Sequence, residues 1–164
     1  MKTKNYISLA KKSADIQINE LKKIKKIFNK SFVKAVDLIL NCKGKIIFAG
    51  IGKSGLIARK ISATFSSVGI PSFFCDPAQA LHGDMGQIEK KDILIIFSYS
   101  GNTSELTNML KYANRYRIKV IGVASKPNSI LLKASDIKIN LPKVKESDLT
   151  GMVPTSSTSL TLLF

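Results

Sequence analysis

The chain has 164 residues, of which 45% are hydrophobic, so it is long enough to form one domain with a well-buried core. No apolar run approaches the ~20 residues of a membrane helix, and the amino terminus lacks the apolar stretch of a secretory signal. The formal net charge is +15, but only three of the 26 basic residues are arginines, which argues against sequence-specific nucleic-acid readout. We therefore expect neither a membrane nor a specific nucleic acid among its partners.

The two cysteines, Cys42 and Cys75, lie in apolar surroundings and form no CxxC pair. This usage predicts buried, reduced thiols in a cytoplasmic protein, with no disulfide and no metal site.

The chain begins with a helical pattern and then changes to short apolar runs. Within residues 1–42, apolar side chains recur every three to four positions, as at Leu21, Ile24 and Phe28, with lysines on the polar side. Beyond this N-terminal helical segment, strands alternate with helices, which predicts an α/β fold with a doubly wound, parallel five-stranded sheet flanked by helices. The expected strands are 45–49, 72–75, 93–97, 120–124 and 137–141, and the expected helices are 54–68, 78–81, 103–116 and 129–133.

The segment Ser98-Tyr-Ser-Gly-Asn-Thr-Ser-Glu105 directly follows the apolar run 93–97. It offers several hydroxyl donors, and Gly101 lets a ligand approach the backbone closely. The helix expected at 103–116 points its free N–H groups and positive dipole end at the same place. We interpret this loop as a phosphate site built from Ser98, Ser100 and Thr103.

Glu105 is the unusual member of this loop, because a carboxylate beside a phosphate site is electrostatically unfavourable. It is either an acid in the first helical turn, favoured by the dipole, or a general base acting on a phosphorylated substrate.

The segment Gly50-Ile-Gly-Lys-Ser-Gly55 places GxGxxG after a strand and before a helix, with Asp76 about twenty residues further on. This spacing is typical of a dinucleotide site. However, the chain has no room for the substrate domain of a hydride-transfer enzyme, and Asp76 precedes a proline, which suits a turn residue as well as a ribose ligand.

Pro154-Thr-Ser-Ser-Thr158 is another hydroxyl cluster at an expected helix start. Together with Ser54 and the 98–105 loop, it places three such loops at the same edge of one sheet. A single phosphoryl group explains all three loops, whereas a dinucleotide explains one.

These motifs, with Pro71-Ser-Phe-Phe74 and Leu81-His-Gly-Asp84, resemble the sugar isomerase (SIS) domain of D-arabinose 5-phosphate isomerases. The resemblance runs from about residue 42 to the end and implies interconversion of D-ribulose 5-phosphate and D-arabinose 5-phosphate, the first step towards Kdo of the lipopolysaccharide. We expect no cofactor and no metal, since two glutamates and a lysine suffice for this reaction; a metal that stabilises the enolate intermediate is the alternative. The resemblance also implies self-association, as a dimer or homotetramer.

The resemblance assigns roles residue by residue. Lys53, Glu105 and Glu146 match the family's catalytic lysine and two glutamates. The substrate and its phosphate would be held by Gly52, Ser54, His82, Ser98, Ser100, Thr103, Thr155, Ser156 and Ser157.

Each of the less specific assignments also has a structural alternative. Glu146 is equally suited to pair with Lys145, Lys53 to lie on a helix surface, and the single histidine, His82, to cap or pack. The family places another histidine beyond the third loop, and longer members continue into cystathionine-β-synthase (CBS) repeats. We expect residues 1–164 to form a single SIS domain, truncated at its C-terminal end and without CBS repeats, that is weakly active or inactive alone. Two alternatives remain open: a non-catalytic sugar-phosphate sensor and another SIS sugar-phosphate isomerase.

Overall fold

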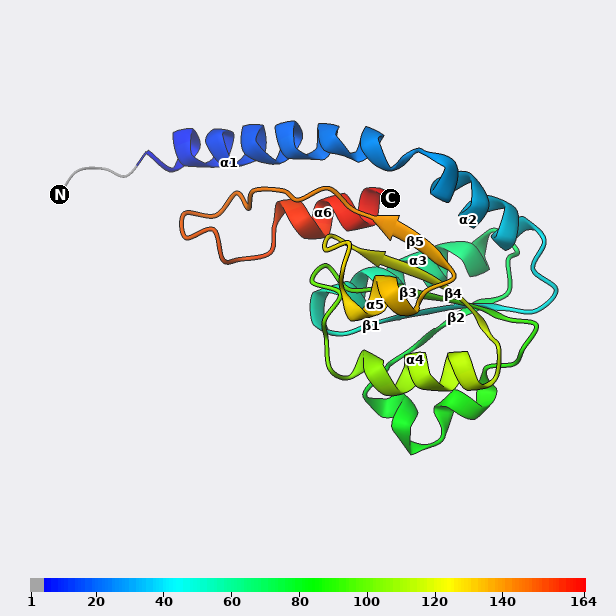
Figure 1. Ribbon diagram of the computed structural model, residues 1–164. Coiled ribbons are helices and arrows are strands. Elements are labelled where there is room, and N and C mark those ends of the chain that lie inside the picture. Colours follow the sequence, from blue (N-terminus) through cyan, green and yellow to red (C-terminus); the bar gives the residue numbers. More distant parts are fainter. Residues whose placement is uncertain (1–4) are drawn as a thin grey trace.

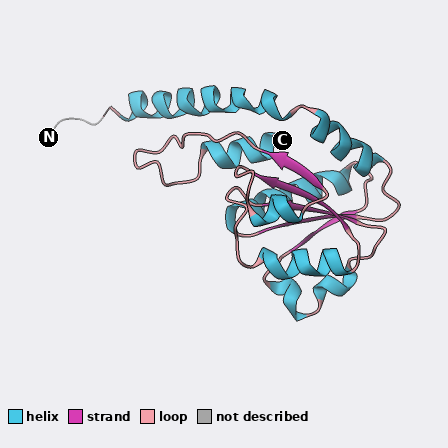
Figure 2. Ribbon diagram, in the orientation of Figure 1, coloured by secondary structure: helices cyan, strands magenta, loops and turns pink. Residues whose placement is uncertain are grey.

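The computed structural model describes residues 5–164, so the first four residues of the expected N-terminal helical segment lie outside the described part. Helical and strand elements alternate after two N-terminal helices (Figures 1 and 2). In chain order they are α1 (Tyr6–Leu21), the 3₁₀ helix η1 (Lys22–Ile27), α2 (Lys30–Leu40), β1 (Ile46–Gly50), α3 (Gly52–Ser67), β2 (Ser72–Cys75), the 3₁₀ helices η2 (Gln79–His82) and η3 (Asp84–Gln87), β3 (Ile93–Phe97), α4 (Leu106–Arg115), β4 (Lys119–Ala124), α5 (Ile130–Ala134), β5 (Ile137–Asn140) and α6 (Ser156–Leu163).

The five strands form one sheet in the order β2-β1-β3-β4-β5, and every neighbouring pair is parallel. This is a doubly wound order that reverses direction between β1 and β3. The predicted fold class is therefore confirmed, including the N-terminal helices.

The sheet is covered on both faces, and its strands alternate their side chains between two cores. On one face, Ile47 and Leu94 pack with residues of η2, α4 and α5. On the other, Ile46 and Phe48 pack with residues of η1, α2, α3 and α6. Figure 1 shows the layers, with α4 below the sheet and α2 and α6 above it.

The lysine-rich segment after α1 is wound differently from the prediction. Residues 22–27 form a 3₁₀ helix, in which side chains three positions apart share a face. Ile24 and Ile27 are therefore buried, whereas Phe28, expected beside Ile24 on a regular α-helix, is 52% exposed.

Two further expectations need correction. Helix α4 begins at Leu106 and not at residue 103, because Thr103 and Ser104 carbonyls accept from the amides of Leu106 and Thr107 in a tighter turn. Both cysteines are free, and Cys75 is buried as predicted, but Cys42 is only partly buried. Over residues 5–164, no helix combines the length and hydropathy of a membrane-spanning segment.

The end of β1 lies in close contact with the first turn of α3. A Cβ atom on Gly55 would lie 2.6 Å from the carbonyl oxygen of Gly50, and one on Gly50 would lie 3.0 Å from the carbonyl oxygen of Phe97. No side chain fits in either place, so these two glycines bring the start of α3 onto the ends of β1 and β3.

We expect Gly55→Ala to lower the free energy of unfolding by about 1–3 kcal/mol, because the added methyl meets backbone that cannot move aside. Urea unfolding measures this loss. Gly86→Ala is the matched control, since a Cβ there meets no atom within 4 Å and changes stability by no more than about 0.5 kcal/mol. Equal stability of the two variants would show that the Gly50–Gly55 contact is not a constraint.

Candidate active site

The candidate site lies at the edge where β1 and β3 end, next to the point where the strand order reverses. Gly50 pairs in register with Phe97, so the loops that follow these two residues start side by side. Open α/β sheets bind ligands in the crevice at this kind of position. The sheet register thus brings the first two predicted loops together.

The first loop is a tight turn from β1 into α3. Ile51 is extended, and Gly52 has a φ of 57°, a conformation that glycine adopts without strain. The first amides of the 16-residue α3 have no acceptor within the helix, so Gly52, Lys53 and Ser54 direct free N–H groups towards the edge of the sheet. The Lys53 side chain is exposed and Ser54 is partly buried.

The second loop is organised by its own hydroxyl groups. The buried Ser98 hydroxyl lies 2.9 Å from the Thr103 hydroxyl and accepts a hydrogen bond of 3.1 Å from the Gly101 amide. Gly101 has a φ of 66°, and a Cβ there would lie 2.3 Å from the Ser129 hydroxyl. These contacts hold Ser98 and Thr103 in place, while Ser100 is exposed.

Glu105 follows this loop directly before α4 and is exposed to solvent. Its carboxylate accepts a hydrogen bond of 2.8 Å from the Ser104 hydroxyl. The backbone amide of Glu105 and the Ser104 hydroxyl hold the pKa of this carboxyl below its ordinary value. Glu105 is therefore ionised at neutral pH.

The third cluster forms around Glu146 at the start of α6. The Glu146 carboxylate accepts from the Thr155 amide at 2.7 Å, the Thr155 hydroxyl at 2.9 Å and the Ser157 amide at 3.3 Å. The Thr155 hydroxyl also accepts from the Ser147 amide, so it already has two partners. Glu146 does not pair with Lys145; its side chain caps a helix.

Partial burial raises the pKa of Glu146, but the hydrogen bonds from Ser157 and Thr155 outweigh this effect and leave the pKa below its ordinary value. Beside it, the fully buried Ser156 hydroxyl has no hydrogen-bond partner among residues 5–164. A buried polar group without a partner is unusual and often belongs to a ligand site.

Tyr99 connects the second loop to the third. Its hydroxyl donates to the Pro142 carbonyl at 3.4 Å and accepts from the Val144 amide at 3.0 Å. Burial and the nearby Glu146 charge raise the pKa of Tyr99, so the hydroxyl keeps its proton. The sequence carries no signal for this bond between Tyr99 and the segment before Glu146.

Glu20 is a second residue of this region for which the sequence carries no signal. From the end of α1, its carboxylate accepts from the Lys145 amide at 3.0 Å and pairs with Lys23 at 2.5 Å. A cavity of about 610 Å³ also opens here, between α1 and the segment 145–151, and includes Glu146 in its lining. The N-terminal helix thus helps to hold the stretch of chain that carries Glu146.

Within residues 5–164, the His82 side chain forms no hydrogen bond with these three clusters. It is exposed at the end of η2, which packs on the α4 side of the sheet, opposite α6 (Figure 1). Asp76, the acid at dinucleotide spacing, accepts from the Ala78 amide at 2.9 Å and closes a turn. Its carboxylate is therefore engaged as a turn residue would be.

Comparison with known proteins agrees with this geometry. The family model described as "SIS domain" matches residues 39–164. The chain is 41% identical over 98% of its length to the uncharacterized protein RP505 of Rickettsia prowazekii, covering 50% of that protein. It is 40% identical over 97% of its length to the arabinose 5-phosphate isomerase KdsD of Francisella tularensis, again covering 50%.

Among solved structures, c3406 of Escherichia coli CFT073 in complex with arabinose 5-phosphate superposes with a TM-score of 0.93 at 32% identity, over 99% of this chain and 87% of that one. The chain is thus a doubly wound α/β protein, and it belongs to the SIS domain family. It spans about half the length of the curated relatives that it matches.

We expect Glu146→Gln to lower the free energy of unfolding at pH 7 by about 1–3 kcal/mol, because a neutral amide is a weaker acceptor at a helix start. The pKa of Glu146 is lowered on folding, so its stabilisation is complete above the unfolded value near 4.5 and is lost as the pH falls through the folded value. Urea unfolding at pH 7 and pH 3 measures the difference.

Thr155→Val is the control for this prediction, because it removes an uncharged partner of the same carboxylate. We expect Thr155→Val to lower the free energy of unfolding at both pH values, whereas the loss caused by Glu146→Gln becomes smaller at pH 3. If the loss of stability in Glu146→Gln did not change with pH, this would contradict the assignment of an ionised Glu146 that caps α6.

Proposed function

We propose that this SIS domain binds a pentose 5-phosphate and interconverts D-arabinose 5-phosphate and D-ribulose 5-phosphate. The observation that carries the proposal is the meeting of two hydroxyl-and-amide loops at the β1/β3 edge, with Glu105 at the rim. The arabinose 5-phosphate isomerases among its relatives, and the sugar-phosphate complex of a structural neighbour, support the choice of sugar.

The phosphate would be bound by neutral donors. Ser98 and Thr103 are held in place by their mutual hydrogen bond, and Ser100 and Ser54 add hydroxyl groups at the open side. The N-terminal amides of α3, including that of Gly52, add a positive partial charge. Such a site holds a dianion without a bound metal.

The isomerisation moves one proton between two carbons. A carboxylate removes the C2 proton of the aldose, and the electron pair moves through a C1–C2 double bond onto the carbonyl oxygen to give an enediolate. The proton returns to C1, and the O2 proton moves to O1, which leaves the carbonyl at C2. Glu105 and Glu146 supply the two carboxylates in this proposal, and Lys53 stabilises the enediolate charge.

Both glutamates have a lowered pKa, so each is ionised at neutral pH before substrate arrives and has a lone pair to accept a proton. Glu105 is exposed and accepts one hydrogen bond from another side chain, that of Ser104, whereas Glu146 accepts three hydrogen bonds at the start of α6. We therefore assign the transfer of the carbon-bound proton to Glu105 and the transfer of the proton between O2 and O1 to Glu146. Ser156, with its unpaired buried hydroxyl, would complete the third cluster once a ligand is bound.

Self-association as a dimer or tetramer is part of the same proposal. Helix α1 has no buried residue, and the large apolar side chains of Tyr6, Ile7, Val33 and Leu40 are more than half exposed. Exposed apolar side chains at this density favour an interface between copies. In this proposal the domain acts in the supply of Kdo for lipopolysaccharide.

Isothermal titration calorimetry of the 164-residue chain tests the ligand class. We expect arabinose 5-phosphate to bind at least tenfold more tightly than arabinose, because the phosphate contacts supply most of the affinity. NAD serves as the competitor suggested by the GxGxxG segment. Tighter binding of NAD than of arabinose 5-phosphate would overturn the proposal, and Ser98→Ala should weaken only the phosphorylated sugar.

A further inference from the structure

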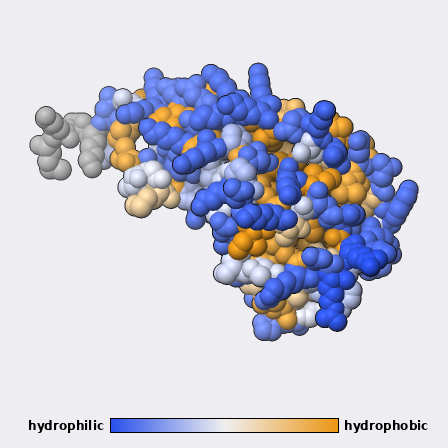
Figure 3. Space-filling view, in the orientation of Figure 1, coloured by the Kyte–Doolittle hydropathy of each residue, from blue (hydrophilic) through white to orange (hydrophobic). Residues whose placement is uncertain are grey.

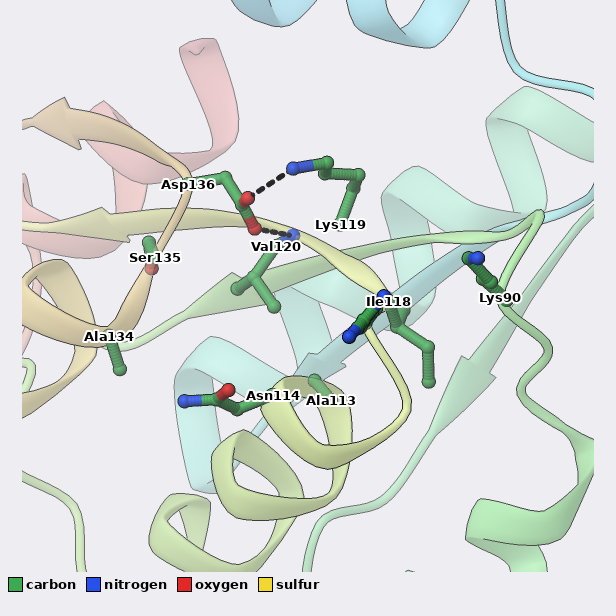
Figure 4. Close-up of a pocket in the computed structure, with 10 residues that line it drawn as sticks. Lys90, Ala113, Asn114, Ile118, Lys119, Val120, Ala134, Ser135 and Asp136 are labelled. Carbon is green, nitrogen blue, oxygen red and sulfur yellow. Dashed lines mark hydrogen bonds and ion pairs between the residues drawn. The ribbon is translucent and has the colours of Figure 1, made fainter.

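A second cavity lies at the opposite edge of the sheet from the candidate active site. It has a volume of about 520 Å³ and opens between the end of α4, the start of β4 and the turn before β5. Figure 4 shows Val120 pointing from the start of β4 towards α4, where Ala113 and Asn114 lie. The cavity is within the size range of small-molecule sites, and none of the residues assigned to the isomerase site lines it.

The rim of this cavity carries more positive than negative charge. Lys90, Arg117 and Lys119 line it, against the single carboxylate of Asp136. Asp136 already accepts from the Lys119 ammonium at 2.6 Å and from the Val120 amide at 2.9 Å (Figure 4). Within residues 5–164, Lys90 and Arg117 have no ion-pair partner, so two cations remain for an anionic ligand.

Arg117 is held in a backbone conformation that favours glycine. Its φ is 56°, and it occupies the position after the C-cap of α4, where the Arg117 and Ile118 amides bond to the carbonyls of Asn114 and Ala113. Helices that end in this way usually place glycine there, because a side chain is strained at positive φ. The chain therefore keeps a cation at the cavity at a cost in local backbone energy, and such strain is concentrated at functional sites.

The inner wall of the cavity is apolar. Ala113, Ile118 and Val120 are all at most 3% exposed, and the Asn114 amide lies at their edge. Buried apolar walls with cations at the rim match a ligand with an apolar or ring-shaped body and a phosphate group. We propose that this cavity is a second binding site for a small phosphate ester, separate from the candidate active site.

General attraction to a protein of net charge +15 is the competing explanation, because hydrophilic side chains cover much of the face seen in Figure 3. A matched pair of variants separates the two explanations. Arg117→Gln and Arg115→Gln remove the same charge two residues apart, but only Arg117 lines the cavity. A general effect would respond equally to both changes.

The experiment is a titration of the full 164-residue chain with adenosine 5′-monophosphate, and separately with arabinose 5-phosphate, followed by amide NMR in about 0.15 M NaCl, where distant surface charges are screened. We expect saturable shifts of the amides of residues 117–120 with at least one of the two esters. The more tightly bound ester shows whether the site takes a nucleotide or a sugar phosphate. Shifts at residues 98–103 report the candidate active site separately.

We expect Arg117→Gln to weaken binding at the cavity at least fivefold and Arg115→Gln to leave it within twofold. Arg117→Gly should weaken binding as much as Arg117→Gln while the melting temperature stays the same or rises, since the strain is relieved. Weaker binding without a lower melting temperature excludes loss of folding as the cause. Shifts at residues 117–120 that do not saturate, or an equal loss of affinity in the two glutamine variants, would overturn the proposal. This holds whether or not the amides of residues 98–103 shift.

Discussion

The contact between Gly50 and Gly55 is the constraint on which the rest of the site depends. Because these residues lack side chains, the first turn of α3 lies against the ends of β1 and β3, and its free amides face the loop that follows Phe97. A larger residue at either position would separate the two loops. The same segment resembles a dinucleotide motif for this reason: both kinds of site need a helix start placed close to a strand end.

The third cluster is placed by longer-range hydrogen bonds. Tyr99 lies between two serines of the second loop, and its hydroxyl holds the segment before Glu146, while Glu20 holds the following amide from the opposite side. The Glu146 carboxylate then caps α6. A change in the second loop would therefore act on Glu146 through Tyr99, which links this loop to one of the two carboxylates of the proposed reaction.

The sequence predicts the sheet well, because its three central strands are short apolar runs that are almost wholly buried. The predicted ranges 72–75 and 93–97 are correct at both ends. The sequence predicts the start of α4 three residues too early, since a local turn competes with the helix there. It gives no signal for the bonds of Tyr99 to Val144 or of Glu20 to Lys145, whose partners lie 45 and 125 residues apart. Such pairs depend on the complete fold. The roles of Lys53, Glu105 and Glu146 come from the resemblance of the motifs to the family and stay predictions.

The central claim is that Glu105 moves a carbon-bound proton of a sugar phosphate bound at the β1/β3 edge. Its most direct test is the incorporation of deuterium from D₂O at C2 of arabinose 5-phosphate, measured by NMR for the wild type, Glu105→Gln and the distant control Glu89→Gln, each in a chain extended to include the histidine that the family places beyond the third loop. The account predicts incorporation by the wild type and by Glu89→Gln, and a loss of about 10²–10⁴-fold in Glu105→Gln with its affinity for the sugar unchanged. Tight binding without incorporation by the wild type would indicate a sugar-phosphate sensor, and wild-type incorporation by Glu105→Gln would remove Glu105 from the reaction.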